Sequence, residues 1–335
     1  MNFKRENYID SLRAIAILFV VIFHYTYHYD NDYLYRNSSW SFEFTKYGWS
    51  GVDIFFIISG YCIGMTIVKT QNFTEFVVKR FARLYPAFFI SGIITLIFYH
   101  FFELPGREVS WHTGFMNLIF ANFIPGLNYQ YIDGIYWALI VEIKFYLFFG
   151  LLFFINKDLT KSIYLWFAFC VIGNLILLFD KKTYIFFTSI FPHANLFLFG
   201  LLIYNLNKIS FKFFNVTLIY LIISLFINER YENFEVYFIF VFTLVFLILK
   251  KKFFFNNKLL SYVGLISYTW YLTHNAIGII IIREVNKLSF YNISIFLAII
   301  LTFGLAILIY HFIEIKSKIL IIKHYKNLKT KYNLK

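Results

Sequence analysis

The sequence predicts an all-α integral membrane protein, a bundle of about ten transmembrane helices with both termini in the cytoplasm. The chain has 335 residues, of which 60% are hydrophobic and 15% are charged, and its mean hydropathy is +0.66. This composition excludes an ordinary soluble protein. Because about twenty apolar residues cross one hydrocarbon core, about ten crossings take roughly 200 positions and leave room only for short loops.

Apolar stretches separated by charge-rich breaks are the expected helices. We place them at 12–29, 49–68, 86–102, 135–155, 162–179, 186–204, 213–227, 236–249, 261–282 and 293–312. The first is not expected to be a cleaved signal peptide, because Arg13 and His24 interrupt its apolar run. We expect one membrane-embedded domain, 1–315, followed by a basic cytoplasmic tail, 316–335.

The distribution of Lys and Arg predicts the orientation. With the N-terminus inside, the cytoplasmic segments carry 22 of these residues and the outer loops carry 8, as the positive-inside rule requires. The loop 180–182 fits least well, since it is basic yet assigned outside. The net charge of +13 therefore indicates topology and contact with membrane lipids, not a nucleic-acid partner. The expected location is the plasma (inner) membrane.

The cysteines and the longest loop are expected to have structural roles. Cys62 and Cys170 lie inside apolar runs, so we expect small buried side chains without a disulfide, redox chemistry or a metal site. The loop 103–134 contains Trp111 among prolines and glycines, with Trp137 just beyond it. Aromatic residues of this kind favour the membrane–water interface, so the loop is predicted to rest on the outer surface.

Titratable side chains inside the expected helices are candidates for the functional site, because a buried charge is costly in lipid. Arg13 and His24 are eleven positions apart, which places them on one face of the first helix about 16 Å apart. The helix would present a cation near the cytoplasmic surface and an imidazole beyond the midplane. The alternative is that Arg13 reaches the inner headgroups and His24 is a hydrogen-bonded packing residue.

Glu142 is the predicted partner of His24. It lies roughly 10 Å below the expected outer end of the helix 135–155, a depth close to that of His24. A carboxylate beside an imidazole would stabilise the imidazolium and fix its tautomer, as a general base acting on a hydroxyl requires. The competing pair of Glu142 with Lys144 is disfavoured, since residues two apart on a helix point to different faces.

The second helix carries small and acidic residues. Ser59, Gly60 and Gly64 would let another helix or a ligand approach the backbone closely, and packing is at least as good an explanation as binding. Asp53 enters one turn from the expected outer surface. It would either orient an acceptor or stay hydrated.

Two more candidates lie near opposite ends of the bundle. Arg80 and Arg83 would form one basic face at the cytoplasmic surface if that segment is helical, suited to a pyrophosphate or phosphomonoester. Ordinary anchoring to anionic lipid explains them as well. His274 lies in the outer half of the helix 261–282, where a single histidine is more often structural.

The assembled motifs resemble the membrane-bound acyltransferase family 3, whose members move acetyl or related groups onto extracytoplasmic glycans. The resemblance spans nearly the whole chain. It rests on Leu12-Arg13 with His24, Gly51-Val52-Asp53 with Ser59-Gly60, Arg80 and Arg83 with Pro86, Trp137 with Glu142 and Tyr146, Ser267-Tyr268 with His274, and Phe312-Ile313-Glu314. It implies an acyl-CoA donor, with the arginines at the CoA end and the histidine of the first helix at the reaction centre.

The sequence also departs from the family pattern. Around Glu142 the family usually has serines and a second acid or glutamine, where this chain has Ala138, Ile140, Ile143 and Lys144. These differences affect the expected acceptor contacts more than the chemistry. After Glu314 the usual basic residue and proline are replaced by Ile315-Lys316, so no catalytic role is assigned to Glu314. An appended hydrolase-like domain, present in some members, is not expected here.

The resulting hypothesis is an O-acyltransferase that moves an acetyl group from acetyl-CoA to a hydroxyl of a cell-surface or lipid-linked sugar. No metal is expected. The predicted site comprises catalytic His24 and Glu142, CoA-binding Arg13, Arg80 and Arg83, and substrate-binding Asp53, Ser59, Trp137 and His274. The alternatives are a transporter or flippase of lipid-linked sugars, with the buried charges along its path, and a non-catalytic subunit that binds an enzyme through its basic tail.

Overall fold

The structure is a computed structural model that describes residues 7–29, 43–102, 104–179 apart from 105, 108, 125 and 128, 190–227, 257–288 and 290–332. Within these ranges the chain is helical and has no strand. The α-helices are α1 (Asn7–Phe23), α3 (Gly51–Ile67), α4 (Phe73–Phe101), α5 (Trp111–Leu118), α6 (Trp137–Asn156), α7 (Leu159–Phe179), α8 (Phe191–Tyr204), α9 (Phe211–Ile227), α11 (Lys258–Asn286), α12 (Tyr291–Ile309) and α13 (Ile315–Lys331).

The described helices confirm an all-α integral membrane protein. Seven helical segments are long and apolar enough to cross a membrane, and α8 and α9 contribute shorter apolar helices. The predicted helix 236–249 and the loop 180–182 lie outside the described residues, so the total of about ten crossings stays a prediction.

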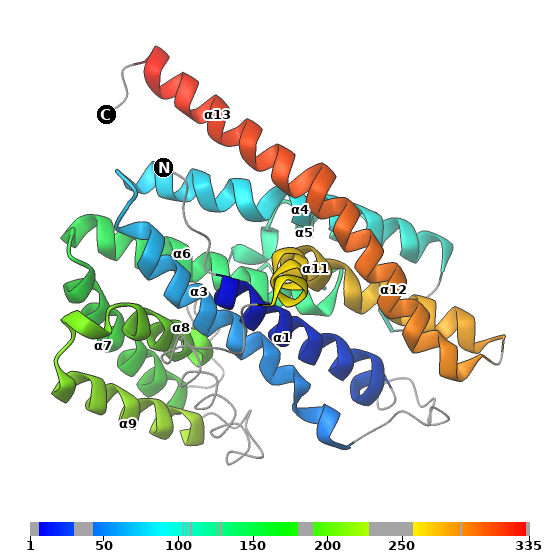
Figure 1. The fold of residues 1–335 in the computed structure, drawn as a ribbon, viewed down its shortest axis with the longest axis horizontal. Helices are drawn as coiled ribbons and strands as arrows, with labels where there is room; N and C mark the ends of the chain where they lie inside the picture. The colour runs from blue at the N-terminus through cyan, green and yellow to red at the C-terminus, as the bar shows by residue number, and fades with distance from the viewer. Residues whose placement is uncertain are drawn as a thin grey trace.

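The helices pack around α1, α3 and α11. α1 contacts both α3 and α11, α3 packs along α8, and α11 also contacts α4 and α12. Figure 1 shows α1 and α3 in the middle of the molecule, with α7, α8 and α9 on one flank and α12 followed by α13 on the other. The charged and titratable candidates are carried mainly by the central helices.

A pair of glycines sets the close crossing of α3 and α8. A Cβ atom added at Gly60 would lie 2.1 Å from the Phe197 carbonyl oxygen, and one added at Gly200 would lie 2.0 Å from the Ile57 carbonyl oxygen. Backbone meets backbone at this point, which small residues allow in membrane bundles. Of the two explanations for Gly60, the structure therefore supports helix packing.

We expect Gly200→Ala to destabilise the protein, because the added methyl group must push α3 and α8 apart. Overpacking of this kind lowers the free energy of unfolding by about 1–3 kcal/mol. Gly304→Ala in α12 is the matched control, since nothing lies within 4 Å of its added Cβ and alanine favours a helix. Thermal melts in detergent measure the difference, and equal midpoints for the two variants would contradict the close crossing.

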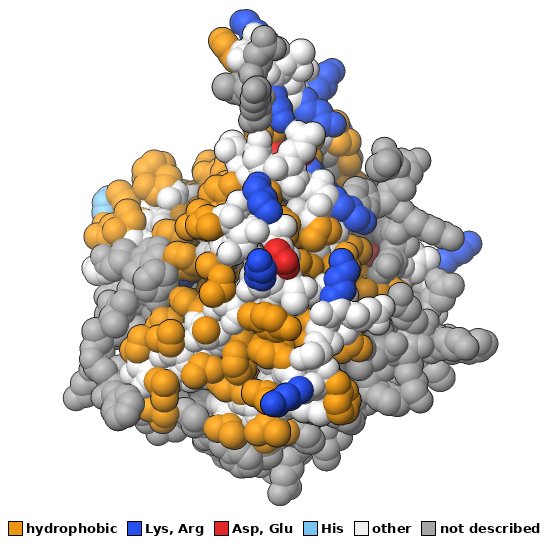
Figure 2. All heavy atoms as spheres, turned by 90° about the vertical axis from the view of Figure 1, so that its left-hand side faces the viewer, with side chains coloured by type: hydrophobic (Ala, Val, Ile, Leu, Met, Phe, Trp, Pro, Cys, Tyr) orange, Lys and Arg blue, Asp and Glu red, His pale blue; other side chains and the backbone are white. Residues whose placement is uncertain are grey.

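Basic side chains gather at one end of the bundle, where α4 begins and α6 ends. Figure 2 views this end and shows Lys and Arg side chains spread over it. The exposed ones in the short connections and the first turns of α7 and α9 are Lys69, Lys157, Lys161, Lys208 and Lys212. This clustering agrees with the predicted positive-inside orientation, and we refer to this end as the inner end.

The helix α4 extends further than the predicted range 86–102. It begins at Phe73, where the Asn72 side chain accepts a hydrogen bond from the Glu75 amide at 2.9 Å, a standard N-cap. Arg80 and Arg83 therefore lie within a 29-residue helix and are half-buried against neighbouring helices. A hydropathy average misses this part of the helix because its charged residues lower the mean.

The C-terminal helices form one continuous rod. α12 passes through a π-helical turn, Tyr310–Glu314, into α13, and α13 reaches back to the start of α4, where Lys329 Nζ donates to Gln71 at 2.7 Å. Figure 1 shows α13 projecting beyond the rest of the bundle. The segment predicted as a basic tail is thus helical through Lys331, and its separation from the membrane domain stays a prediction.

The prediction that the loop 103–134 rests on the outer surface is wrong. Gly114 of α5 packs on Leu96 of α4, and the Phe120 ring stacks on Phe88 with ring centroids 4.7 Å apart. Phe88 lies thirteen residues before the end of α4 at Phe101, which corresponds to about 20 Å along the helix. The segment therefore re-enters the bundle alongside α4.

Two asparagines make this re-entrant segment compatible with the membrane interior. The Asn117 amide donates to the carbonyls of Thr113 (2.9 Å) and Gln130 (2.8 Å). The Asn122 side chain donates to the Tyr129 carbonyl at 2.8 Å and accepts from its amide at 2.9 Å. Backbone groups at membrane depth need such internal partners, because lipid supplies none.

Cysteine labelling tests the re-entrant path. Trp111 and Ile119 are similarly exposed, 58% and 49%, but only Trp111 lies near the outer end of α4, where its ring approaches His100. In a protein without Cys62 and Cys170, we expect Trp111→Cys to react with an impermeant thiol reagent in intact cells and Ile119→Cys to be protected by lipid. Equal labelling of the two positions would contradict the re-entrant path and would place the segment on the outer surface.

Candidate functional site

A cavity in the inner half of the bundle brings together three charged side chains from different helices, Arg13, Arg83 and Glu142. It is lined from α1, α3, α4, α6 and α11. Its polar side chains are Arg13, Ser59, Arg83, Glu142, Ser267 and Tyr268. Its apolar wall includes Val52, Phe55, Leu139 and Tyr271, so one part of the cavity is charged and another part is hydrophobic.

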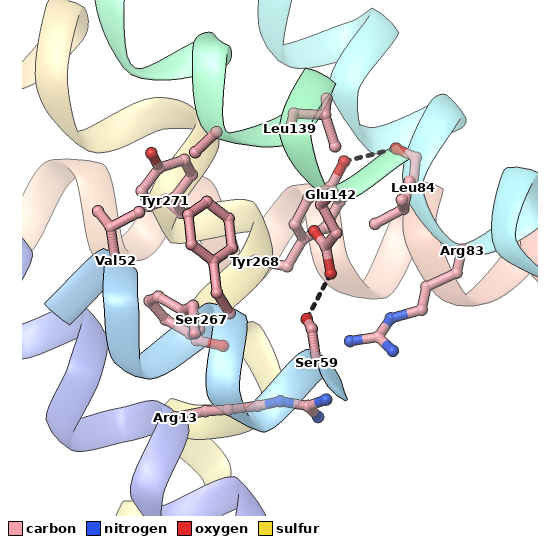
Figure 3. A pocket seen from close by; sticks show the side chains of 13 residues that line it. Arg13, Val52, Ser59, Arg83, Leu84, Leu139, Glu142, Ser267, Tyr268 and Tyr271 are labelled. Carbon is pink, nitrogen blue, oxygen red and sulfur yellow. Dashed lines mark hydrogen bonds between the residues drawn. The ribbon is translucent and has the colours of Figure 1, made fainter. Parts of the chain in front are cut away.

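Glu142 is held at the charged part of the cavity. Its carboxylate accepts hydrogen bonds from Ser59 Oγ at 2.6 Å and from the Tyr146 hydroxyl. Figure 3 shows the guanidinium groups of Arg13 and Arg83 pointing toward the same space beside the Ser59–Glu142 pair. A half-buried carboxylate in the same cavity compensates part of the charge of the two arginines, which lowers the cost of keeping them in the membrane.

The three arginines of the predicted CoA site have different surroundings. Arg13 lines the cavity, donating to Asp10 Oδ1 at 3.4 Å and to Cys62 Sγ at 3.3 Å. Arg83 also lines the cavity. Arg80 instead turns to the end of α3, where its Nη2 donates to Thr66 Oγ1 at 2.5 Å. The predicted basic face at the cytoplasmic surface is thus divided, with Arg83 in the cavity and Arg80 in a packing contact.

His24 and His274 form a buried pair above this cavity. His24 Nδ1 lies 2.8 Å from the Val20 carbonyl oxygen and 3.3 Å from His274 Nε2. His274 Nδ1 lies 2.8 Å from the Tyr271 carbonyl oxygen. A carbonyl oxygen only accepts hydrogen bonds, so each ring carries its proton on Nδ1. His24 therefore keeps an unprotonated Nε2, the form that a general base needs.

The structure corrects the predicted pairing of His24 with Glu142. The start of α6 lies midway along α11, because the Tyr136 hydroxyl donates to the carbonyl of Leu272, the central residue of α11. Glu142 lies five residues beyond Trp137 along α6, toward the inner end. His24 contacts His274, which lies on α11 two residues beyond Leu272, toward the outer end. The two depths differ because α6 begins midway along α11 and not at its outer end.

Tyr271 connects the cavity to the histidine pair. Its ring lines the cavity, and the ring centroid lies 5.6 Å from that of His274. The Tyr271 hydroxyl donates to the Ile135 carbonyl at 2.9 Å, which fixes the ring between α11 and α6. Tyr271 is therefore the residue that contacts both the cavity and the histidine pair.

Asp53 lies deeper than predicted. The 3-10 helix Glu43–Ser50 precedes α3 and extends the span outward, and Gly51 packs on Ala16 in the middle of α1. Asp53 is consequently 0% exposed, which excludes the hydrated position near the surface.

Trp137 stands apart from the cavity lining. Its ring centroid lies 5.0 Å from that of His193 in α8 and 6.0 Å from that of Phe56. His193 is buried and was not selected from the sequence. Both residues belong to an aromatic contact between α3, α6 and α8, so an acceptor contact for Trp137 stays a prediction.

Other residues of the site were also missed by sequence reasoning. Asp133 accepts from Asn275 Nδ2 at 2.5 Å and from the Ala276 amide at 2.8 Å, next to His274. The Tyr25 hydroxyl donates to the His274 carbonyl at 2.7 Å. Asp133 lies in a segment predicted to be a surface loop, and tyrosines are numerous in this chain, so neither residue gave a local signal.

Metal binding is not indicated within the described ranges, where no group of three or more His, Cys, Asp or Glu side chains is arranged to hold an ion.

The fold and site define a multi-pass membrane protein with a charged cavity in the inner half of the bundle and a buried pair of histidines, both of which contact Tyr271. The chain belongs to the family of the acyltransferase domain, whose sequence profile matches residues 6–311. The family resemblance drawn from the motifs is therefore confirmed.

Three relatives illustrate the similarity. The chain is 35% identical over 102 residues to the peptidoglycan O-acetyltransferase of Listeria monocytogenes, covering 28% of this chain and 14% of that protein. It is 32% identical over 91 residues to the O-acetyl transferase of Shigella phage Sf6, covering 27% and 26%. It is 27% identical over 162 residues to nodulation protein 10 of Rhizobium leguminosarum bv. viciae, covering 42% of each. The matches thus span less than half of these relatives. No solved structure matches the chain significantly.

Proposed function

We propose that this protein is an O-acyltransferase of the plasma membrane that transfers an acetyl group from acetyl-CoA to a hydroxyl of a cell-surface or lipid-linked glycan. The observation that carries the proposal is the position of Tyr271, which lines the same cavity as Arg13 and Arg83 and contacts His274 of the histidine pair. Membership of the acyltransferase-domain family supports the reaction class. The names of the relatives support acetyl transfer to a cell-envelope polymer.

The donor enters from the inner end in this proposal. Arg83 and Arg13 bind phosphate oxygens of CoA by charge-assisted hydrogen bonds, and Glu142 with Ser59 keeps Arg83 oriented before the donor arrives. The apolar wall of the cavity suits the uncharged pantetheine arm, which carries the thioester toward Tyr271. The arginines then hold the charged part of the donor, while the acyl group reaches the interior of the bundle.

His24 acts on the acceptor. Its Nε2 takes the proton of the glycan hydroxyl as the hydroxyl oxygen attacks the thioester carbonyl. The carbon–sulfur bond breaks, and the CoA sulfur leaves with the electron pair and takes a proton from the His24 imidazolium. The ring returns to its starting tautomer, with its proton kept on Nδ1 throughout.

Acetyl transfer by the purified protein tests the function. The protein is reconstituted in vesicles with acetyl-CoA labelled in the acetyl group and a cell-envelope glycan fraction, and the label is followed. Label on the glycan that alkaline hydrolysis releases supports O-acylation. Movement of a lipid-linked sugar across the vesicle without label transfer would favour the transporter instead.

We expect Arg83→Ala to weaken donor binding far more than Arg80→Ala. A charge-assisted phosphate contact contributes about 1.5–3 kcal/mol, so Arg83→Ala should raise the KM for acetyl-CoA about tenfold to a hundredfold. Arg80→Ala should change this KM less than threefold but lower the melting temperature, since Arg80 holds Thr66 and lies 5.2 Å from the Phe76 ring centroid. A larger rise in the KM for acetyl-CoA in Arg80→Ala than in Arg83→Ala would assign the donor site to Arg80.

A further inference from the structure

We propose that His274 is a positioning residue for His24, and that the two imidazoles work as a dyad. In this dyad a neutral histidine has the role that a carboxylate has behind the histidine of a catalytic triad. The inference rests on the proposed function, because it assigns a role within the same reaction. It replaces both the predicted Glu142 partner and the predicted substrate contact of His274.

The hydrogen-bond directions support this role. His24 donates its Nδ1 proton toward Val20 and His274 Nε2, and His274 donates its own Nδ1 proton to Tyr271. When His24 takes the hydroxyl proton at Nε2, positive charge spreads to its Nδ1–H group. The lone pair of His274 Nε2 then accepts a charge-assisted hydrogen bond, which is stronger than the neutral bond before reaction. His274 thereby stabilises the imidazolium that forms in the transition state.

The same contacts argue against binding of the glycan by His274. Its side chain is 0% exposed, and both ring nitrogens are engaged, Nδ1 with the Tyr271 carbonyl and Nε2 with His24. The ring has no further polar atom to offer a sugar hydroxyl. His24, in contrast, has its Nε2 available for the acceptor.

Side chains from other elements hold the His274 segment in place. The Tyr25 hydroxyl donates to the His274 carbonyl at 2.7 Å, and the Tyr136 hydroxyl donates to the Leu272 carbonyl at 3.2 Å. Asp133 accepts from the Ala276 amide at 2.8 Å. Bonds before, at and after His274 thus tie its backbone to the π-helical turn His24–His28 and to the residues just before α6. Such support fixes reacting groups within narrow limits.

Two substitutions separate positioning from substrate binding. His274→Leu removes the acceptor, whereas the side-chain oxygen of His274→Gln can accept from His24 Nδ1 in place of Nε2. With labelled acetyl-CoA and the envelope glycan fraction, we expect His274→Leu to lower kcat at least tenfold and leave the half-saturating glycan concentration within twofold. His274→Gln should recover kcat to within threefold of the wild type.

Other results would overturn the dyad. A raised half-saturating glycan concentration with unchanged kcat would make His274 a substrate contact. Wild-type kcat in His274→Leu would remove any role in the reaction. Equal loss in both variants together with a lower melting temperature would show a purely structural role.

A spectroscopic measurement tests the contact without any turnover. In protein labelled with 15N-histidine and placed in lipid nanodiscs, the ring signals of His24 are assigned by their loss in His24→Ala. They should shift in His274→Leu and return toward wild type in His274→Gln, whereas unchanged signals in both variants would refute the dyad. If the wild-type protein transfers no acetyl group, the proposed function fails, and these signals still decide whether the imidazoles are coupled.

Discussion

Replacing His24 by alanine is expected to lower acetyl transfer at least a hundredfold while the protein still folds and inserts. General base catalysis contributes about 10²–10⁴ in rate, and alanine is well tolerated in a helix. The motivation is the single unprotonated nitrogen that the hydrogen bonds to Val20 and His274 leave on this ring. Transfer of label from acetyl-CoA to glycan, normalised to purified protein, measures the effect.

The matched control is His28→Ala. This imidazole lies one turn further along the chain, with its ring centroid 5.3 Å from that of His24, and its Nε2 lies 3.3 Å from Arg107 Nη2. We expect the control to lose less than tenfold in rate. If His24→Ala keeps more than a tenth of the wild-type rate, or if His28→Ala is the more severe change, His24 is not the base.

Replacing Glu142 by glutamine is expected to reduce turnover at least a hundredfold and also to lower stability. The substitution keeps the size of the side chain but removes the negative charge that compensates Arg13 and Arg83 in the cavity. Removing one partner of a fully buried charge group costs about 3–5 kcal/mol, because the remaining charge is left uncompensated. The half-buried position of Glu142 reduces this cost, since water reaches part of the cavity. Acetyl transfer and the melting temperature in detergent are measured together.

Glu75→Gln serves as the control for loss of one carboxylate. Glu75 lies in the first turn of α4 at the inner end and pairs with Lys79 at 2.6 Å. A pair at the end of the bundle contributes little to stability, because water compensates the lost charge. We expect activity within twofold of the wild type. Should Glu142→Gln behave like this control, the charge of Glu142 has no part in the donor site.

The sequence alone was sufficient for the class of protein and for most helices. Long apolar runs, their interruption by charge and the helical spacing of Arg13 and His24 are properties of the local chain. The order of the motifs was sufficient for the family, which the match over residues 6–311 confirms. Ser59 was selected as a small residue, Arg83 as part of a basic face and Glu142 as a charge inside an apolar helix, and the structure brings all three to one cavity.

Relative depth was decided only by the tertiary structure. The sequence prediction aligned α6 with the outer surface, but the chain before it descends beside α4, as the stacking of Phe120 on Phe88 shows. This moves Glu142 toward the arginines and leaves His274 as the partner of His24. A hydropathy pattern reports whether a segment is apolar, and it contains no information on the height at which neighbouring helices meet.

The direction of side chains around a helix was the second property that required the tertiary structure. Arg80 and Arg83 are three residues apart, and the sequence could only place them on a shared face. Packing of α4 against α3 and α6 then sends Arg80 to Thr66 and Arg83 to the cavity. Helical periodicity fixes the angle at which each side chain leaves its own helix. The hydrogen-bond partner of a long side chain depends instead on which neighbouring helix offers an acceptor, and neighbouring helices come from distant parts of the chain.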